Sequence, residues 1–259
     1  MLRVAFKVAY IGTKFHGSQY QPELRTVEGE IRKAFEKAGI ECGKIMFAGR
    51  TDSGVHAIGN VFATDLEEFS EKVVKILNSN LPEDVSVWGY KIVDENFKPR
   101  KAKWRKYCYV IVDEGYNLEE MKRAAKHFIG KHDFRFFVKG RGSCVREVYE
   151  SDVERRGNLI YFSIKANAFA WNMVRRMASS LMVAGKEGVE EFLKILNGER
   201  IVSAAPPEGL VLVDVHYGFE FEKEEFGLLK LRNQIKKLLF SHGQLFGAFN
   251  VFNETFNFF

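Results

Sequence analysis

The amino-acid sequence predicts an α+β fold in which two consecutive ferredoxin-like β-α-β-β-α-β units join their antiparallel sheets. Two stretches, 3–93 and 104–217, show the same order of strand-like and helix-like hydrophobic patterns. The 259 residues are 46% hydrophobic and 14% aromatic, which is enough apolar material for a large core. We therefore expect a globular protein whose two units meet across a pseudo-two-fold, with the active-site cleft between them.

The first unit begins with a strand over 3–10, in which apolar side chains alternate at Val4, Phe6, Val8 and Tyr10. A helix follows over 27–38, because Thr26 can cap its start and Gly39 can end it. The remaining elements expected in this unit are two short strands, a helix and a strand, over 44–48, 57–64, 66–77 and 85–93.

The second unit repeats this order after a boundary near 97–103. Its expected strands are 104–112, 146–154, 159–166 and 210–217, and its expected helices are 118–129 and 171–184. The sequence thus divides into an N-terminal half, 1–97, a C-terminal half, 98–217, and an extension, 218–259. The extension contains an amphipathic helix over 225–240 and ends in FGAFNVFNETFNFF, whose Phe side chains we expect to pack on the body.

Charge and cysteine content narrow the functional class. The net charge is +5, and residues 98–156 alone hold 16 Lys and Arg against 9 Asp and Glu. This excess suits an anionic partner, although a solvated basic face is an equally good explanation of the charge alone. The three cysteines lack CxxC spacing, which favours neither a disulfide framework nor a zinc site. No metal or nucleotide-cofactor motif and no membrane-spanning run is present, so we expect a cofactor-free cytoplasmic protein.

The loop Gly49-Arg50-Thr51-Asp52-Ser53-Gly54 is the sharpest local feature. Its glycines bracket Arg50 and Asp52 between two apolar strands, so the backbone would hold both side chains at a strand end. An Asp in such a loop usually forms a turn by accepting bonds from nearby amides. The pattern alone does not make Asp52 catalytic.

A second feature is the basic run over 98–106, which has six basic residues in nine and leads directly into Tyr107. Cations bind phosphates and aromatic rings stack on unpaired bases, so this pattern suits RNA, with Lys101, Lys103 and Lys106 as candidate phosphate contacts. The alternative is a solvated linker followed by an ordinary core strand.

The third feature is the helix that follows 167–171, where Arg175 lies beside the apolar face and Arg176 points about 100° away from that face. A guanidinium at the edge of a buried stripe usually pairs with a carboxylate, most often for structural reasons.

Together these segments resemble the TruA family of tRNA pseudouridine synthases over nearly all of residues 4–217. The motifs that carry the resemblance are Tyr10-Ile11-Gly12-Thr13, Gly49 through Ala57, Asn80-Leu81-Pro82, Arg105-Lys106-Tyr107, Asn167-Ala168-Phe169, Met173-Val174-Arg175 and Pro207-Glu208-Gly209-Leu210. Two positions depart from the family pattern, where Ser18 replaces a Trp and Lys98-Pro99 replaces His-Ala. These departures leave the catalytic motif unchanged but bear on RNA docking.

The resemblance implies roles for four residues: Asp52 as the catalytic carboxylate, Tyr107 as the ring that packs on the target uracil, Arg175 as the partner of Asp52, and Arg50 as an aid to base extrusion. It also implies a cofactor-free homodimer that isomerises uridines at positions 38–40 of the tRNA anticodon stem-loop.

The implied reaction breaks the bond from C1′ to N1, turns the uracil and rejoins it through C5, without redox chemistry. A carboxylate can attack C1′, add to the base or remove a proton from C2′, and the sequence leaves these three open. A non-catalytic RNA-binding protein or RNA chaperone on the same scaffold would explain the basic run but not the grouping of Arg50, Asp52, Tyr107 and Arg175. A small-molecule enzyme fits the positive central segment less well.

Overall fold

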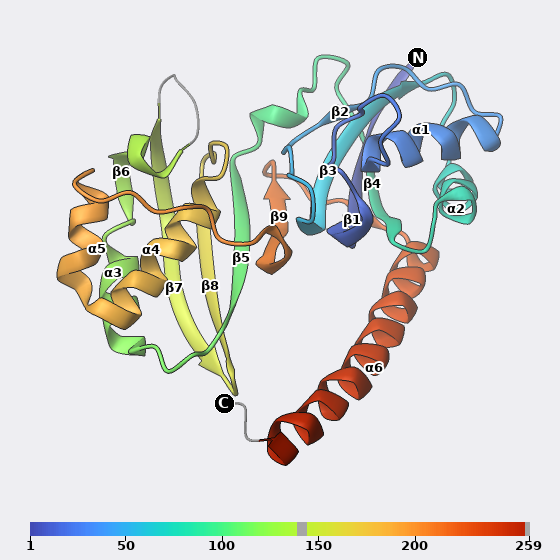
Figure 1. Cartoon of the computed structure of the whole chain (residues 1–259). Helices are drawn as coiled ribbons and strands as arrows, with labels where there is room; N and C mark the ends of the chain where they lie inside the picture. The colour runs from blue at the N-terminus through green and yellow to red at the C-terminus, as the bar shows by residue number, and fades with distance from the viewer. Residues whose placement is uncertain (139–143, 257–259) are drawn as a thin grey trace.

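One mixed β-sheet runs through the computed structural model (Figure 1). The structure describes residues 1–138 and 144–256, with the side chains of 245–256 excepted, and within this part the sheet has ten strands. Their order is β10-β4-β1-β3-β9-β5-β8-β7-β6, and the short strand β2 pairs with β3 outside this path. The predicted joining of two sheets is confirmed.

The N-terminal half follows the expected β-α-β-β-α-β order. Its elements are β1 (Leu2–Tyr10), α1 (Val27–Lys37), β2 (Met46–Phe47), β3 (His56–Leu66), α2 (Glu71–Asn80) and β4 (Val85–Val93). The prediction that α2 begins at 66 is wrong, because β3 continues to Leu66 and pairs there with Leu2 of β1. The side chain of Thr26 caps α1 as expected, accepting from the Gly29 N–H.

The C-terminal half repeats that order with additions. Its elements are β5 (Trp104–Val112), α3 (Leu118–Lys126), β6 (Gly130–Asp133), β7 (Val145–Arg156), β8 (Leu159–Ala166), α4 (Met173–Glu187), α5 (Val189–Leu196) and β9 (Leu210–His216). The sequence analysis did not predict β6 or α5. In Figure 1, α3, α4 and α5 lie together against one face of this half of the sheet.

Aromatic side chains build the core of each half. In the N-terminal half Phe6 stacks on Phe62 at 4.9 Å between ring centroids and meets Phe35 of α1 edge-on. In the C-terminal half Phe128 lies at the centre of a cluster that includes Phe162 of β8. Each half therefore holds its own strands and helices in place, which leaves the boundary between the halves free to form a site.

The halves join where β3 and β9 run side by side in parallel, with His56 opposite Val211 and Ala57 opposite Leu212. This edge of β3 is open because β2 covers only Ala63 and Phe62. The junction pairs the third strand of one unit with the last strand of the other. A two-fold axis at this junction would have to pair equivalent strands, so no such axis relates the two units. The pseudo-two-fold expected from the sequence is therefore wrong.

The extension forms β10 (Glu222–Lys223) and a long helix, α6 (Glu225–Phe256), that projects from the N-terminal half (Figure 1). Near the start of α6, Gly227 lies directly against the carbonyl of Val87. The Lys230 ammonium donates to the carbonyls of Asn78 and Leu81, at 2.7 and 2.8 Å.

The helix of the extension is longer than the predicted 225–240. The expected packing of the terminal Phe residues concerns side chains outside the described part of the chain. Among the described helices, none combines the length and apolar character that crossing a membrane requires.

Candidate active site

An open cleft of about 770 Å³ lies between the two halves. The N-terminal half lines it with the loop after β1 and the loop between β2 and β3, and the C-terminal half with β5 and the start of α4. The cleft expected between the units is therefore present, and it brings together all four residues to which the family resemblance gives a role: Arg50, Asp52, Tyr107 and Arg175.

Backbone contacts fix the loop that carries Asp52. The Thr51 N–H donates to the Ser18 hydroxyl at 2.9 Å, and the Ser18 N–H donates in return to the Thr51 carbonyl at 3.0 Å. The Thr51 hydroxyl also bonds to the buried phenol of Tyr10 at 2.8 Å. Ser18, which departs from the family pattern, is completely buried and supports the loop that carries Asp52.

Gly17 makes this close approach of two loops possible. Its φ of +97° lies in the left-handed region that favours glycine, and a Cβ there would come within 2.9 Å of the Thr51 carbonyl. Any other residue at this position would push the loop after β1 away from the Asp52 loop.

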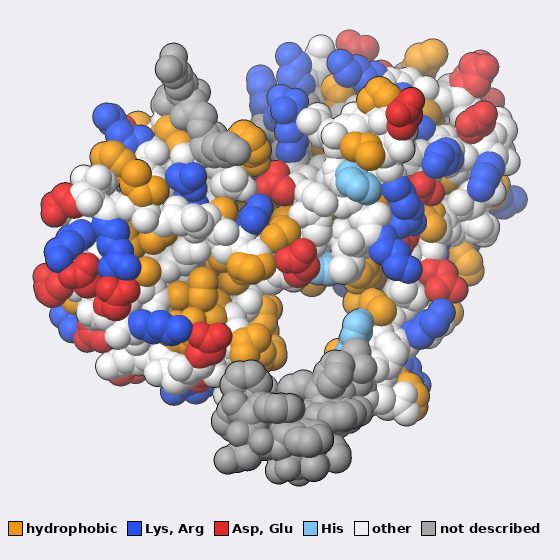
Figure 2. All heavy atoms as spheres, in the orientation of Figure 1, with side chains coloured by type: hydrophobic (Ala, Val, Ile, Leu, Met, Phe, Trp, Pro, Cys, Tyr) orange, Lys and Arg blue, Asp and Glu red, His pale blue; other side chains and the backbone are white. Residues whose placement is uncertain are grey.

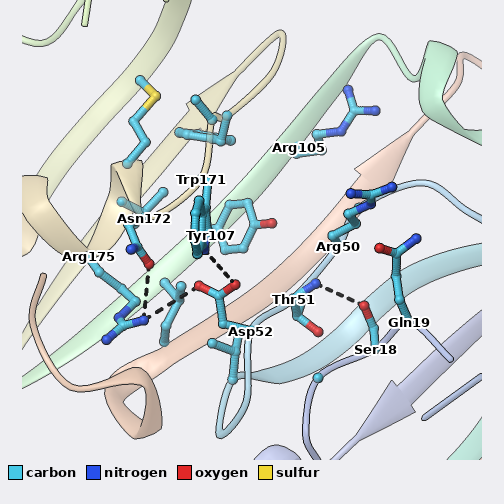
Figure 3. A pocket seen from close by; sticks show the side chains of 18 of the residues that line it. Ser18, Gln19, Arg50, Thr51, Asp52, Arg105, Tyr107, Trp171, Asn172 and Arg175 are labelled. Carbon is cyan, nitrogen blue, oxygen red and sulfur yellow. Dashed lines mark hydrogen bonds and ion pairs between the residues drawn. The ribbon is translucent and has the colours of Figure 1, made fainter. Parts of the chain in front are cut away.

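Two donors from the C-terminal half hold the Asp52 carboxylate (Figure 3). The indole N–H of Trp171 donates to Oδ1 at 3.1 Å, and Nη1 of Arg175 forms an ion pair with Oδ2 at 3.5 Å. The side chain of Asp52 remains 35% exposed, so the carboxylate is both held and accessible from the cleft. The expected Asp52–Arg175 pair is formed across the boundary between the halves.

Arg175 is itself held by its own half of the protein. Its Nε donates to the Ala205 carbonyl at 2.6 Å, and its Nη1 donates to the side-chain oxygen of Asn172 at 3.2 Å. Asn172 precedes α4 with φ +62°, a left-handed conformation that Asn tolerates better than most residues. This turn places Trp171 outside the helix and Arg175 one turn inside it, so both side chains reach the same carboxylate.

Tyr107 forms part of the cleft wall beside Asp52 (Figure 3). Its residue is only 7% exposed, and its ring meets Phe169 edge-on at 5.1 Å between centroids. Burial raises the pKa of the Tyr107 phenol, which therefore stays neutral at physiological pH. The ring is fixed by packing, while one side of it faces the cleft.

Arg105 is a cleft residue to which the sequence analysis gave no role. Its guanidinium donates to four backbone carbonyls, one of them in the N-terminal half and three in the C-terminal half. These carbonyls belong to Ala48, Arg100, Ala102 and Asn167. Burial lowers the pKa of Arg105. The signal that points to it is its position two residues before Tyr107, on the same inward face of β5.

The basic residues predicted to bind RNA do not all lie on one surface. Arg50 is exposed at the cleft, and Lys101 and Lys103 are exposed on the connection between β4 and β5. Figure 2 shows Lys and Arg side chains gathered over this connection, above the gap between the halves. Lys106 instead lies on the opposite face of β5 from Tyr107 and is 3.9 Å from the Glu150 carboxylate.

Among the described residues, no group of three or more His, Cys, Asp or Glu side chains is arranged to hold a metal ion. Cys42, Cys108 and Cys144, all in the described part of the chain, form no disulfide. The chemistry available in the cleft is that of one carboxylate, its two donors, and the rings and cations around them.

Comparison with known proteins identifies the family. A family model described as tRNA pseudouridine synthase matches residues 7–98 and 124–218, which include both Asp52 and Arg175. The chain belongs to this family. Tyr107 and the basic connection fall between the two matched segments, so their assignment depends on the structure and on the resemblance described above.

Relatives that match this chain over most of their length are named tRNA pseudouridine synthase A. Proteins called tRNA pseudouridine synthase A from Archaeoglobus fulgidus and Pyrococcus furiosus are 42% and 39% identical to this chain, over 98% of it and 99% of each relative. The corresponding protein of Methanococcoides burtonii is 41% identical over 87% of this chain and 86% of its own. Among solved structures, an archaeal box H/ACA sRNP Nop10-Cbf5 complex matches 70% of this chain and 43% of that one, with a TM-score of 0.37 and 14% identity.

Proposed function

We propose that this protein is a tRNA pseudouridine synthase in which Asp52 is the catalytic carboxylate. The observation that carries the proposal is the Asp52 carboxylate in the cleft, held by Arg175 and Trp171 from the other half and placed beside the buried ring of Tyr107. Membership of the family and the names of its full-length relatives support the reaction class.

The site suits an isomerisation that needs no external reagent. Each possible first step, attack on C1′, addition to the base or removal of a C2′ proton, requires an ionised carboxylate. Arg175 places a cation beside Oδ2 and the Trp171 N–H donates to Oδ1, so each oxygen of the carboxylate has a partner.

The walls of the cleft suit an extruded nucleotide. A volume of about 770 Å³ lies in the range that ligand sites usually occupy. The ring of Tyr107 offers a surface for the uracil, and a base that leaves its stack needs such contacts to compensate for the stacking it gives up. The exposed position of Arg50 at the cleft supports the proposal that it assists the extrusion.

The finer substrate assignment follows from the family resemblance. We propose that the target uridines are positions 38–40 of the tRNA anticodon stem-loop, and that the protein acts as a cofactor-free homodimer in the cytoplasm. The exposed Lys101 and Lys103 support this partner, because they place positive charge beside the cleft where the backbone of a stem would pass. Lys106 is a weaker candidate for binding the RNA backbone.

Pseudouridine mapping in tRNA incubated with the purified protein tests the proposal. Wild-type protein should form pseudouridine at positions 38–40, and Asp52→Asn should form none while binding tRNA within about threefold of wild type, because the amide keeps the shape but loses the charge. Asp152→Asn, at an exposed position on β7, is the matched control and should keep full activity.

Substantial turnover by Asp52→Asn would exclude Asp52 as the essential carboxylate. Tight tRNA binding by the wild type with no pseudouridine at any position would instead support a non-catalytic RNA-binding protein.

A further inference from the structure

The Asp52 carboxylate has a second donor that the sequence motifs did not indicate. Trp171 donates its indole N–H to Oδ1 at 3.1 Å, whereas the Arg175 contact with Oδ2 is longer, at 3.5 Å (Figure 3). A contact of 3.5 Å is at the long, weak end of the hydrogen-bond range, so the indole N–H makes the shorter and stronger of the two contacts.

We propose that Trp171 is a positioning residue that fixes the rotation of the Asp52 carboxylate. The proposal rests on the function proposed above, since it concerns the same carboxylate. With Oδ1 held by the indole and Oδ2 by the guanidinium, the plane of the carboxylate is defined by two contacts from residues 171 and 175, on either side of the turn that opens α4.

Core packing does not account for the position of the indole. Trp171 is 55% exposed, although a large aromatic residue normally contributes most when it is buried. It stands immediately before α4, where the left-handed backbone of Asn172 separates it from the helix. The apolar residues of α4 that do enter the core begin with Met173 and Val174. The placement of Trp171 therefore serves the cleft rather than the core.

The residues around the start of α4 thus hold the carboxylate together. Asn172 accepts from Arg175, and Trp171 and Arg175 on either side of it donate to Asp52. Hydrogen bonds to a charged group are stronger than those between neutral groups. Loss of the indole N–H should leave a carboxylate that rotates more freely.

The test compares Trp171→Phe with Trp88→Phe under single-turnover conditions across pH 5–8. Trp88 is the matched control, because its indole N–H donates to the Ile58 carbonyl at 2.6 Å and the residue does not line the cleft. We expect Trp171→Phe to slow the chemical step about tenfold or more at neutral pH, the fold-change typical of losing one hydrogen bond to a charged group. Its tRNA affinity should stay within about threefold of wild type, so that the loss lies in the chemical step and not in binding.

A second variant removes only the donor. Replacing the Trp171 indole by benzothiophene, through a benzothienylalanine residue, keeps the size and the aromatic surface but puts sulfur in place of N–H. This variant should show the same slowing of the chemical step as Trp171→Phe, and Trp88→Phe should show none.

A single-turnover rate within twofold of wild type in the benzothienylalanine variant would overturn the role of Trp171. In that case an inactive Asp52→Asn would still support the proposed function, so the two failures are distinguishable. A slowing in Trp88→Phe as large as that in Trp171→Phe would also overturn the role, because the effect would then not belong to the cleft.

Discussion

At the scale of single residues, Tyr107 has a position that fits both core packing and the role proposed for it in the cleft. The ring is buried against Phe169 and also lines the cleft beside Asp52. A tyrosine on a strand is commonly a core residue, so burial alone does not distinguish the two roles. The distinction depends on whether the ring or the hydroxyl carries the effect on turnover.

Substitutions at Tyr107 separate the ring from the hydroxyl. Tyr107→Leu removes the stacking surface, worth ~1–3 kcal/mol per stacked base, and should lose most pseudouridine formation. Tyr107→Phe keeps the ring and should keep binding of the target base, with a lower rate only where the hydroxyl takes part in proton transfer. Turnover is measured well below the melting temperature of each variant, and a Leu variant that is folded and fully active would contradict the assignment.

The residues that sequence reasoning missed are those whose role depends on orientation. Asp52 and Arg175 were predicted because they lie within motifs that resemble a family. Trp171 was treated only as the first residue of a helix, and its donation to Asp52 depends on the left-handed turn at Asn172. Arg105 was named only as part of a motif, because four carbonyl partners from separate segments cannot be inferred from the alternation of a strand.

At the scale of elements, the connection between β4 and β5 is an exposed basic segment next to the cleft. Lys101 and Lys103 lie on this connection, whereas Lys106 lies on β5 and faces away from Tyr107 toward Glu150. Exposed charges such as these lysines contribute little to the free energy of unfolding. Changing any of them therefore mainly alters the electrostatic field near the surface where RNA would bind.

The salt dependence of tRNA binding tests this segment. Changing Lys101 and Lys103 together to Ala should weaken binding and reduce the slope of log K against log salt by about 0.7–0.9 for each phosphate that the variant no longer neutralises. Adding Lys106→Ala should change the slope little further, because Lys106 lies on the opposite face of β5. A slope equal to that of wild type in the triple variant would assign all three lysines to a solvated face.

Most elements were predictable because their hydrophobic periods are clear, and the missed ones lack such periods or lie in ambiguous segments. The four residues of β6, Gly130–Asp133, contain no alternating apolar pattern and pair only through their backbone with β7. The extra residues of β3 up to Leu66 could not be distinguished from the start of a helix, because both fit an apolar Leu. Pairing with β1 decides that segment, and pairing is not a local property.

At the scale of the whole molecule, Arg105 links the halves beneath the cleft. Its guanidinium joins the Ala48 carbonyl of the N-terminal half to three carbonyls of the C-terminal half, so it sets the separation between the Asp52 loop and β5.

Replacing Arg105 by Met should therefore destabilise the fold by about 2–3 kcal/mol, since it leaves buried carbonyls without donors. Urea unfolding measures this difference. Arg100→Met, at an exposed position a few residues earlier, is the control and should remain near wild-type stability. Equal stability of the two variants would show that the carbonyls find other donors and that Arg105 is not the link.

In each β-α-β-β-α-β unit the third strand lies toward one side of the sheet and the last strand toward the other, so the two units join head to tail through β3 and β9. A join of this kind has no inherent limit of two units. Here the limit is set by the length of the second strand of each unit, which is β2 in the N-terminal half and β7 in the C-terminal half. In the C-terminal half β7 is 12 residues long and covers β8 from Leu159 to Ala166, which closes that side to a further unit.

In the N-terminal half β2 ends after two residues, and the chain then leaves the sheet as the loop that carries Asp52. That departure exposes His56 and Ala57 for β9 to join. The shortness of β2 thus leaves room both for the loop that carries Asp52 and for the open edge that brings Tyr107 to it. A second strand as long as β7 would cover this edge of β3 and leave β9 nowhere to pair, so the difference in length between β2 and β7 is what lets the two halves enclose a cleft.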